Sequence, residues 1–383
     1  MKVQTKNIII SNAIPTNNGD AALVFGLADQ LKRQGHNVII STFGFSRING
    51  IYANDYNFIK EFYDYNWLNK LKYINIFLYP FFFIFKSSFR NADLIISAPG
   101  GYINSYYGIL KKVVPIIWAK CFGKKVVIYS QSIGPLNIRD KKILRFSMRF
   151  IDYVMVRDHF SHKYINEIID DSMLHKVMRT EDAAFLLNPV TNYRKAVTEK
   201  IACISVRSWS HDERNKEAYY TMIATFTHKL IDKGYRVEFL STCQGLNDYI
   251  DDSKVAKEIV NEYVAHAYKE KIKVNNDYYK LEELRGRLSS FDLVIGTRLH
   301  MCILSLIESI PTLNISYEVK GKECFSYLDL SDYSIDYNSD IDTAVISLNA
   351  LINNRETLSE FISKKITELN IKSQEYLTNV LEK

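Results

Sequence analysis

The sequence predicts an α/β protein built from two domains with parallel sheets. Its 383 residues exceed the size of one typical domain. Short runs of β-branched residues alternate with longer amphipathic stretches, which is typical of parallel strands joined by helices. Only 15 residues are glycine and 7 are proline, which excludes collagen-like and disordered chains. We therefore expect two Rossmann-like domains that face a cleft.

The first domain is predicted over residues 1–190. Its strands are short apolar runs of the kind that parallel sheets bury on both faces. Helices are expected between these strands, which are predicted over 8–12, 37–42, 94–98, 126–130 and 153–157.

The most apolar segment covers residues 73–85 and contains Pro80. Its 13 residues are too few to span a bilayer, which needs about 20, and a proline breaks or kinks a helix. Two interpretations remain open. The segment is either a buried helix pair packed on the sheet, or an aromatic surface whose basic flanks rest on anionic lipid.

The second domain is predicted over residues 198–340, after a polar stretch at 188–200. Strands are expected at 202–206, 236–241, 293–296 and 312–316, and helices at 213–233, 249–266 and 281–290. From residue 341 to 383, apolar residues recur at helical spacing, which predicts a C-terminal helical segment.

The composition also excludes several classes of protein. The five cysteines form no Cys-x-x-Cys pair, so neither a disulfide framework nor a zinc site is expected, and a reducing cytoplasm fits best. The apolar run at 8–10 is too short for a signal peptide. The 49 basic residues are dispersed among 43 acids, which argues against nucleic-acid binding. We expect a cytoplasmic protein, with peripheral contact at the inner face of the membrane as an open alternative.

Three glycine-containing loops follow predicted strands of the first domain. Ligands of doubly wound sheets bind outside the carboxyl ends of the strands, where glycine lets a ligand approach the backbone. The loops contain Asn18-Gly19-Asp20, then Gly100-Gly101-Tyr102 with Asn104, and Ser132-Ile133-Gly134-Pro135. The first is equally compatible with a tight turn in which Asp20 caps a helix.

Arginines follow other predicted strands. Arg157 and Arg207 stand where bidentate binding of a carboxylate or phosphate is possible, although Arg157 also suits a salt bridge to Asp158 or a helix cap. The strongest pattern is Gly296-Thr297-Arg298-Leu299-His300, a strand that runs into a helix. It combines a helix N-terminus, a guanidinium and a titratable imidazole, which predicts an anion site. Lys320 follows the next strand.

Taken together and in order, these loops resemble the polysaccharide pyruvyl transferase family. The resemblance runs from about residue 8 to 330 and also includes Asp182, Phe185, Pro311 and the spacing from Tyr317 to Lys320. It implies a fold like that of the B-type glycosyltransferases (GT-B). It also implies transfer of a pyruvyl group from phosphoenolpyruvate to a sugar, as a ketal, on a bacterial cell-surface polysaccharide or its precursor. Such a polysaccharide is an exopolysaccharide, a capsule or part of the cell wall.

The resemblance and the residue chemistry together define the expected site. The catalytic candidates are His300 and Asp20, where His300 acts as an acid or base or only holds phosphate. Phosphoenolpyruvate is expected to be bound by Arg157, Arg298, Leu299, His300, Lys320 and Arg207. The acceptor, a sugar or a lipid-linked glycan, is expected to contact Asn18, Gly19, Asp20, Gly100, Gly101, Tyr102 and Asn104.

Phosphoenolpyruvate is expected as a co-substrate, and neither a further cofactor nor a metal ion is expected. The alternative function is that of a GT-B glycosyltransferase using a nucleotide sugar, because the same fold hosts both activities.

Overall fold

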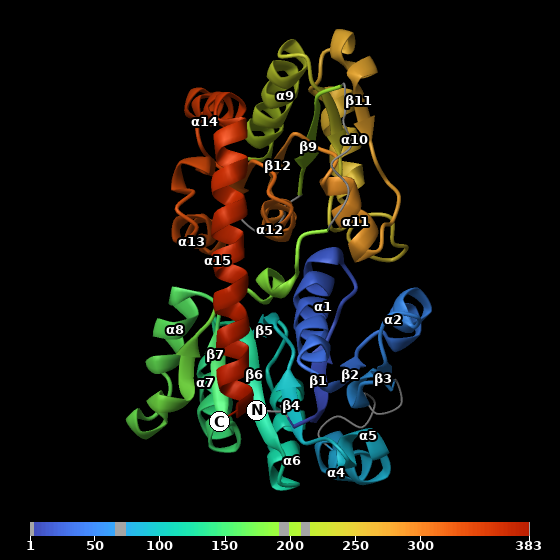
Figure 1. Ribbon diagram of the computed structural model, residues 1–383, viewed down its shortest axis with the longest axis vertical. Coiled ribbons are helices and arrows are strands. Elements are labelled where there is room, and N and C mark those ends of the chain that lie inside the picture. Colours follow the sequence, from blue (N-terminus) through green and yellow to red (C-terminus); the bar gives the residue numbers. More distant parts are fainter. Residues whose placement is uncertain (1–3, 66–73, 191–198, 208–214, 383) are drawn as a thin grey trace. The chain divides into compact units, whose positions relative to one another are not determined.

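The computed structural model describes residues 4–65, 74–190, 199–207 and 215–382, and it confirms the α/β class (Figure 1). The chain divides into two compact units. The first unit contains residues 1–16, 20–187 and 370–383, and the second contains 17–19 and 188–369. Most of the polar stretch that we expected to separate the domains, residues 191–198, lies outside the described residues.

The described part of the first unit contains a parallel sheet of eight strands. Their order is β3-β2-β1-β4-β6-β7-β8, and β5 pairs with β6. The strands are β1 (Asn7–Ala13), β2 (Asn37–Thr42), β3 (Phe58–Lys60), β4 (Leu94–Ser97), β5 (Gly100–Ile103), β6 (Lys125–Ile133), β7 (Tyr153–Val156) and β8 (Val177–Arg179).

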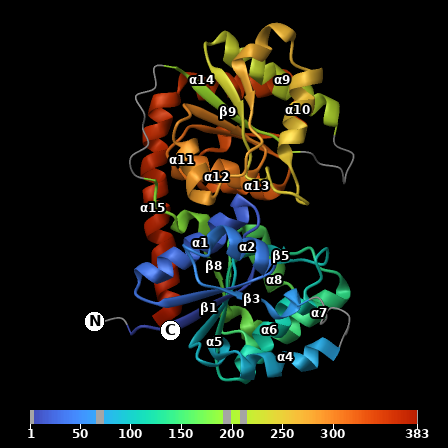
Figure 2. The same ribbon diagram turned by 90° about the vertical axis from the view of Figure 1, so that its right-hand side faces the viewer.

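Helices flank this sheet (Figures 1 and 2). They are α1 (Asn18–Arg33), α2 (Phe45–Tyr52), α4 (Ile74–Phe85), α5 (Ser87–Arg90), α6 (Leu110–Cys121), α7 (Ile138–Ser147) and α8 (His159–Asn166). Short 3₁₀ turns lie at Phe62–Asp64, Met148–Phe150, Asp171–Lys176 and Ala183–Leu186.

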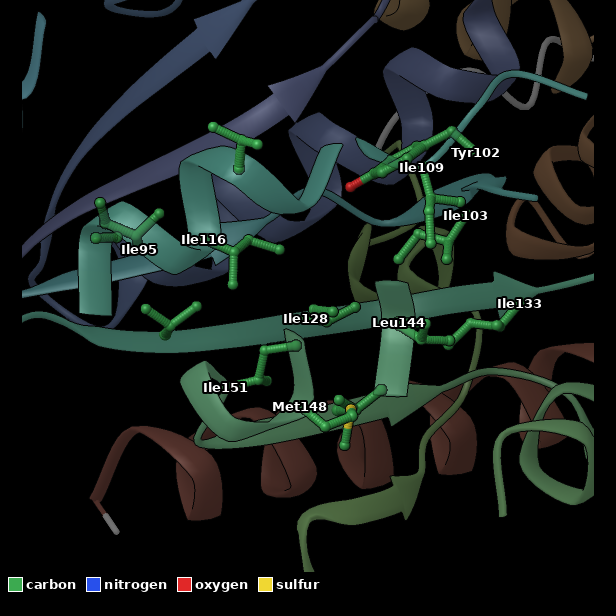
Figure 3. Close-up of a cluster of buried hydrophobic side chains, with 14 of the residues drawn as sticks. Ile95, Tyr102, Ile103, Ile109, Ile116, Ile128, Ile133, Leu144, Met148 and Ile151 are labelled. Carbon is green, nitrogen blue, oxygen red and sulfur yellow. The ribbon is translucent and has the colours of Figure 1, made fainter. Parts of the chain in front are cut away.

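The core of the first unit follows from the register of its strands. Ile9 pairs with Ile95, and Ile95 pairs with Val126. Partners in a parallel sheet point to the same face, so these side chains form one continuous apolar surface. All three are buried, and residues of α6 and α7 such as Ile116 and Leu144 pack with them (Figure 3).

Helix α4 continues through Pro80, which the sequence analysis expected to break or kink a helix. Proline has no backbone N–H, so the carbonyl of Ile76 loses its usual helical donor. The indole N–H of Trp118, on α6, donates to that carbonyl oxygen at 3.2 Å instead. The helix is therefore compatible with its proline because a neighbouring helix supplies the missing hydrogen bond. No helix in the described ranges is long and apolar enough to cross a membrane.

The second unit contains a parallel sheet of six strands among its described residues, in the order β11-β10-β9-β12-β13-β14. The strands are β9 (Ile201–Ser205), β10 (Arg236–Phe239), β11 (Ile272–Val274), β12 (Leu293–Gly296), β13 (Thr312–Ser316) and β14 (Ser334–Asp336). Its helices are α9 (Lys216–Asp232), α10 (Asp252–Glu262), α11 (Leu281–Leu288), α12 (Leu299–Ile307) and α13 (Val319–Tyr327), with 3₁₀ turns at His266–Lys271 and Ser331–Tyr333.

The C-terminal segment forms two helices, α14 (Ile341–Asn353) and α15 (Arg355–Glu382). Residues up to 369 group with the second unit and the remainder with the first. Polar contacts explain why residues 370–383 group with the first unit. The Asn370 amide donates to the carbonyl of Phe185 at 2.7 Å, and the Lys372 ammonium lies 2.6 Å from the Glu181 carboxylate.

Candidate functional site

The strand-to-helix turn at Gly296 is held tightly in the second unit. A Cβ atom added to Gly296 would lie 2.5 Å from the Cys302 sulfur, so only glycine lets α12 pack this close to β12. The Thr297 N–H donates to the carbonyl of Ser205 at 2.8 Å, and the Thr297 hydroxyl lies 2.6 Å from the Tyr219 hydroxyl. The turn is thereby fixed to the neighbouring strand β9 and to α9.

Arg298 is the N-cap residue of α12, and its guanidinium is oriented by Asp252. Its Nε and Nη2 atoms donate to the two carboxylate oxygens of Asp252 at 2.8 and 2.7 Å. The Asp252 side chain is only 2% exposed and also accepts a hydrogen bond from the Ser241 hydroxyl at 2.5 Å. A guanidinium has five N–H donors, and within the described residues the pair with Asp252 uses Nε and Nη2, which leaves the Nη1 group for an anion.

Arg207 lies near Arg298 at the carboxyl end of β9. Its guanidinium carbon is 4.5 Å from the centre of the Tyr317 ring, and it also donates a hydrogen bond to the Tyr317 hydroxyl. Burial is the main cause that lowers the pKa of Arg207, and the positive charge of Arg298 lowers it further. Two arginines close enough to repel each other form a site where an anion is favoured.

His300 occupies the first turn of α12 and lies against Gly19. A Cβ atom added to Gly19 would stand 3.0 Å from both the Cβ and the Nδ1 of His300. The Asn18 side chain donates to the carbonyl of Tyr279 at 2.9 Å, and Asn17 donates to the Tyr249 hydroxyl at 3.0 Å. These contacts group Asn18 and Gly19 with the second unit, whereas the sequence analysis placed both on the acceptor side.

Two further residues predicted to bind phosphoenolpyruvate are also in the second unit. Leu299 is the first residue of α12, next to Arg298. Lys320 is the second residue of α13, with its side chain 39% exposed and its ammonium 3.9 Å from the Glu318 carboxylate.

Arg157 lies in the first unit, where it forms a buried ion pair. Its Nη1 is 2.6 Å from the Asp182 carboxylate, with the two side chains 10% and 5% exposed, and its Nε donates to the Ser132 hydroxyl at 2.9 Å. Asp158 caps α8 by accepting from the Ser161 N–H at 2.6 Å. Within the described part of the first unit, Arg157 therefore forms an ion pair with Asp182, while the adjacent Asp158 caps α8.

The glycine loop after β4 is braced by its own side chains. Tyr102 is buried, and its hydroxyl donates to the carbonyl of Ala98 at 2.7 Å. The Asn104 side chain donates to the carbonyl of Gly101 at 2.7 Å and accepts from the Tyr107 N–H at 3.2 Å. Gly100 begins β5, and Asp20 lies in the first turn of α1.

A buried acid, Glu61, was not identified by the sequence analysis. It follows β3 directly, is fully buried, and accepts a hydrogen bond from the Ser41 hydroxyl at 2.8 Å. Burial raises its pKa. A single glutamate within an aromatic segment has no sequence signal that distinguishes it from a surface acid.

Lys112 forms the other charge of this buried group. Its ammonium lies 4.0 Å from the centre of the Phe43 ring and 5.1 Å from that of Tyr102, and the residue is 8% exposed. Burial lowers the pKa of Lys112 to about 8, although the Glu61 carboxylate opposes this shift. Since a buried amine in the first turn of α6 costs stability, Lys112 is a candidate for contact with the acceptor.

Replacing Lys112 with methionine is expected to stabilise the protein at pH 7 by about 1–3 kcal/mol, because it removes a buried charge. Because the pKa of Lys112 is lower in the folded protein than in the unfolded chain, the unfolded chain binds the proton first as the pH falls. The free energy of unfolding therefore decreases as the pH falls toward about 8. The wild type should therefore gain melting temperature between pH 7 and 9.5, and the Lys112→Met variant should gain less.

The matched control is Lys111→Met, because the neighbouring Lys111 is exposed. Thermal unfolding of the three proteins at several pH values makes the comparison. Equal pH slopes in all three would show that Lys112 does not titrate in this range.

The described ranges contain no group of three or more histidine, cysteine, aspartate or glutamate side chains arranged to hold a metal ion.

Comparison with known families identifies the chain. The sequence pattern of the polysaccharide pyruvyl transferase family matches residues 17–319, which is more than half of the sequence. The chain belongs to the polysaccharide pyruvyl transferase family. The match begins at Asn17 and includes Arg157, Arg298 and His300.

A curated relative of this pyruvyl transferase is the amylovoran biosynthesis protein AmsJ of Erwinia amylovora. It is 25% identical over 314 residues, which cover 78% of this chain and 74% of the relative.

Solved structures show that the fold is of the GT-B type. A glycosyltransferase from Rickettsia africae has a TM-score of 0.63 at 13% identity, with 99% of each chain covered. HepE of Anabaena, in complex with UDP, has a TM-score of 0.61 at 10% identity and covers 97% of this chain and 100% of its own. The UDP-GlcNAc 2-epimerase of Methanocaldococcus jannaschii has a TM-score of 0.60 at 12% identity and covers 98% of each chain. At these identities the likeness concerns the fold alone.

Proposed function

We propose that this pyruvyl transferase uses phosphoenolpyruvate as donor and forms a cyclic pyruvate ketal on a sugar of a bacterial cell-surface polysaccharide or its precursor. Membership of the family supports transfer of a pyruvyl group. The similarity to an amylovoran biosynthesis protein supports a polysaccharide context.

The pair of arginines in the second unit is the observation that carries this proposal. Arg298 and Arg207 follow the paired strands β12 and β9, each two residues beyond the paired residues Gly296 and Ser205, and Arg298 stands at the N-terminus of α12. Phosphoenolpyruvate carries close to three negative charges at neutral pH, so its site needs several cations. Arg298 and Arg207 offer planar donors for carboxylate or phosphate, and Lys320 adds a third positive charge.

The proposed reaction begins with a proton that His300 gives to the methylene carbon of phosphoenolpyruvate. This step breaks the C=C bond and leaves an oxocarbenium-like carbon two. One sugar hydroxyl attacks that carbon, and a second hydroxyl then displaces phosphate and closes the ring. The two hydroxyls release two protons: one restores His300, and the other leaves with the phosphate. Asp20 is the proposed base that takes the second of these protons from the hydroxyl and passes it to the departing phosphate.

Two exposed tyrosines extend the proposed acceptor surface of the first unit. Tyr106 and Tyr107 are 82% and 63% exposed, lie in the segment after β5, and contact each other with ring centres 4.9 Å apart. Exposed aromatic faces suit stacking on sugar rings. Because Tyr102 is buried, these neighbours are better placed for stacking than Tyr102 itself.

Incubation with phosphoenolpyruvate and a panel of sugars and glycan precursors tests the proposal. We expect release of inorganic phosphate together with a pyruvate mass increment on one acceptor. The competing function is glycosyl transfer from a nucleotide sugar. It is worth testing because HepE, which shares the fold, was solved in complex with UDP. Calorimetry measures the binding of each donor to the protein. Binding of a UDP- or GDP-sugar without binding of phosphoenolpyruvate would favour glycosyl transfer and reject ketal formation.

A further inference from the structure

Helix α4 presents an unusual apolar surface to solvent. Five of its side chains are exposed although all are isoleucine or phenylalanine, and we call them the α4 stripe: Ile74, Phe77, Phe81, Ile84 and Phe85. Their spacing of three or four residues, with two adjacent at the end, places them along one side of the helix. Phe77 and Phe85 are 72% and 79% exposed.

The opposite side of α4 is anchored in the first unit. Tyr79 and Phe83 are buried, with Phe83 stacked on Phe122 at 4.7 Å between ring centres and Tyr79 edge-on to Phe62 at 4.9 Å. The helix packs beside α5 and α6 in both views (Figures 1 and 2). The exposed stripe is therefore not needed to hold the helix in place.

Basic residues lie at the C-terminal end of the stripe. Residues 74–125 contain seven lysines and arginines and one acid. Lys112 is buried and Lys120 pairs with Asp152, so these two do not contribute free charge beside the helix. Arg90 and Lys124 are linked to the end of the helix, because Arg90 donates to the carbonyl of Ile84 at 3.2 Å and Lys124 donates to the carbonyl of Arg90 at 2.7 Å. Within the described residues, neither side chain forms an ion pair with a carboxylate.

We propose that the α4 stripe lies on an anionic phospholipid bilayer and docks the enzyme at the membrane surface. Twelve residues give a helix of about 18 Å, too short to span the bilayer but suited to lying in its interface. A second copy of the chain is a poor occupant, because two copies of the same basic surface would repel each other. Anionic headgroups instead complement the basic residues while the phenylalanines enter the acyl boundary.

Helix α4 combines features of both interpretations of residues 73–85. One of its faces is buried on its neighbours, and the other is exposed, where the proposed contact with lipid would take place. Tyr73 itself lies outside the described residues. The inference goes beyond the proposed reaction, since docking at a bilayer requires no particular donor or acceptor.

Sedimentation of the full chain with vesicles tests the inference. The vesicles contain either phosphatidylcholine alone or equal parts of phosphatidylcholine and phosphatidylglycerol. We expect binding only to the anionic vesicles, and weaker binding as salt is added. The double variant Phe77→Gln/Phe81→Gln should bind at least about tenfold more weakly, because the apolar area that enters the bilayer is lost. Arg90→Gln/Lys124→Gln should lose about fivefold for each charge removed.

The matched control is Ile346→Gln/Phe361→Gln, which changes two exposed apolar residues of α14 and α15 that are 69% and 42% exposed. It should bind like the wild type. Pyruvyl transfer to a water-soluble acceptor without vesicles should be unchanged in all these variants, which separates a failure of docking from a failure of the proposed reaction. The inference is overturned if the wild type ignores lipid charge, or if the stripe variant binds as tightly as the control. A wild-type dimer that the stripe variant dissociates, measured by light scattering without vesicles, would also overturn it.

Discussion

Replacing Arg298 with alanine should lower kcat/KM for phosphoenolpyruvate by about 10²–10³-fold. The guanidinium is the donor that we expect to meet the charge of the phosphate or carboxylate, and loss of one such preorganised donor typically has an effect of this size. Arg298 is held in position by the Asp252 carboxylate and by its place at the N-terminus of α12. A water molecule that replaces the guanidinium in the alanine variant would lack this fixed position. Phosphate release at varied phosphoenolpyruvate concentration measures the loss.

The Arg298→Ala change should also destabilise the fold by about 3–5 kcal/mol, because it leaves the Asp252 carboxylate buried without its cation. Arg287→Ala is the matched control, since Arg287 also pairs with a buried carboxylate, that of Glu238, at 5% exposure. Both variants should melt at lower temperature, but only Arg298→Ala should lose activity per folded molecule. Equal activity losses in the two would mean that Arg298 is structural.

The two-domain α/β fold could be predicted because its central strands contain runs of three or more apolar residues. β1, β4 and β12 are examples, and each coincides with a predicted strand. The strands β3, β8, β11 and β14 have three residues each, too few for a period to be recognised, and β5 begins with two glycines. The missed strands therefore lie at sheet edges or in a glycine-rich loop, where local pattern is weakest.

The site could be predicted only where residues are neighbours in sequence. Arg298 and His300 were identified because a strand, a glycine and a helix start bring them together within five residues. Asp252 was not, because Asp251-Asp252 at a helix start is typical of capping, and its contact with Arg298 spans 46 residues. The packing of Gly19 on His300 is likewise a long-range contact that no local pattern contains.

Replacing His300 with glutamine should reduce kcat by about 10²–10⁴-fold while changing the KM for phosphoenolpyruvate little. Glutamine keeps a hydrogen-bonding group of similar reach but cannot transfer a proton, so the change isolates general acid–base catalysis from phosphate binding. Steady-state kinetics of phosphate release give both parameters. If His300 only holds the phosphate, the glutamine variant should instead keep most of its kcat.

Two further variants make the comparison specific. His266→Gln changes an exposed histidine of the same unit and should leave both kinetic parameters unchanged. Gly19→Ala adds a methyl group that meets the Cβ and Nδ1 of His300 at 3.0 Å, so the imidazole must shift by a few tenths of an ångström. Proton transfer depends steeply on that geometry. We therefore expect Gly19→Ala to lower kcat in the same direction as His300→Gln, and by less, although its histidine is intact. A full-rate Gly19→Ala enzyme would show that the position of the His300 ring does not limit the reaction.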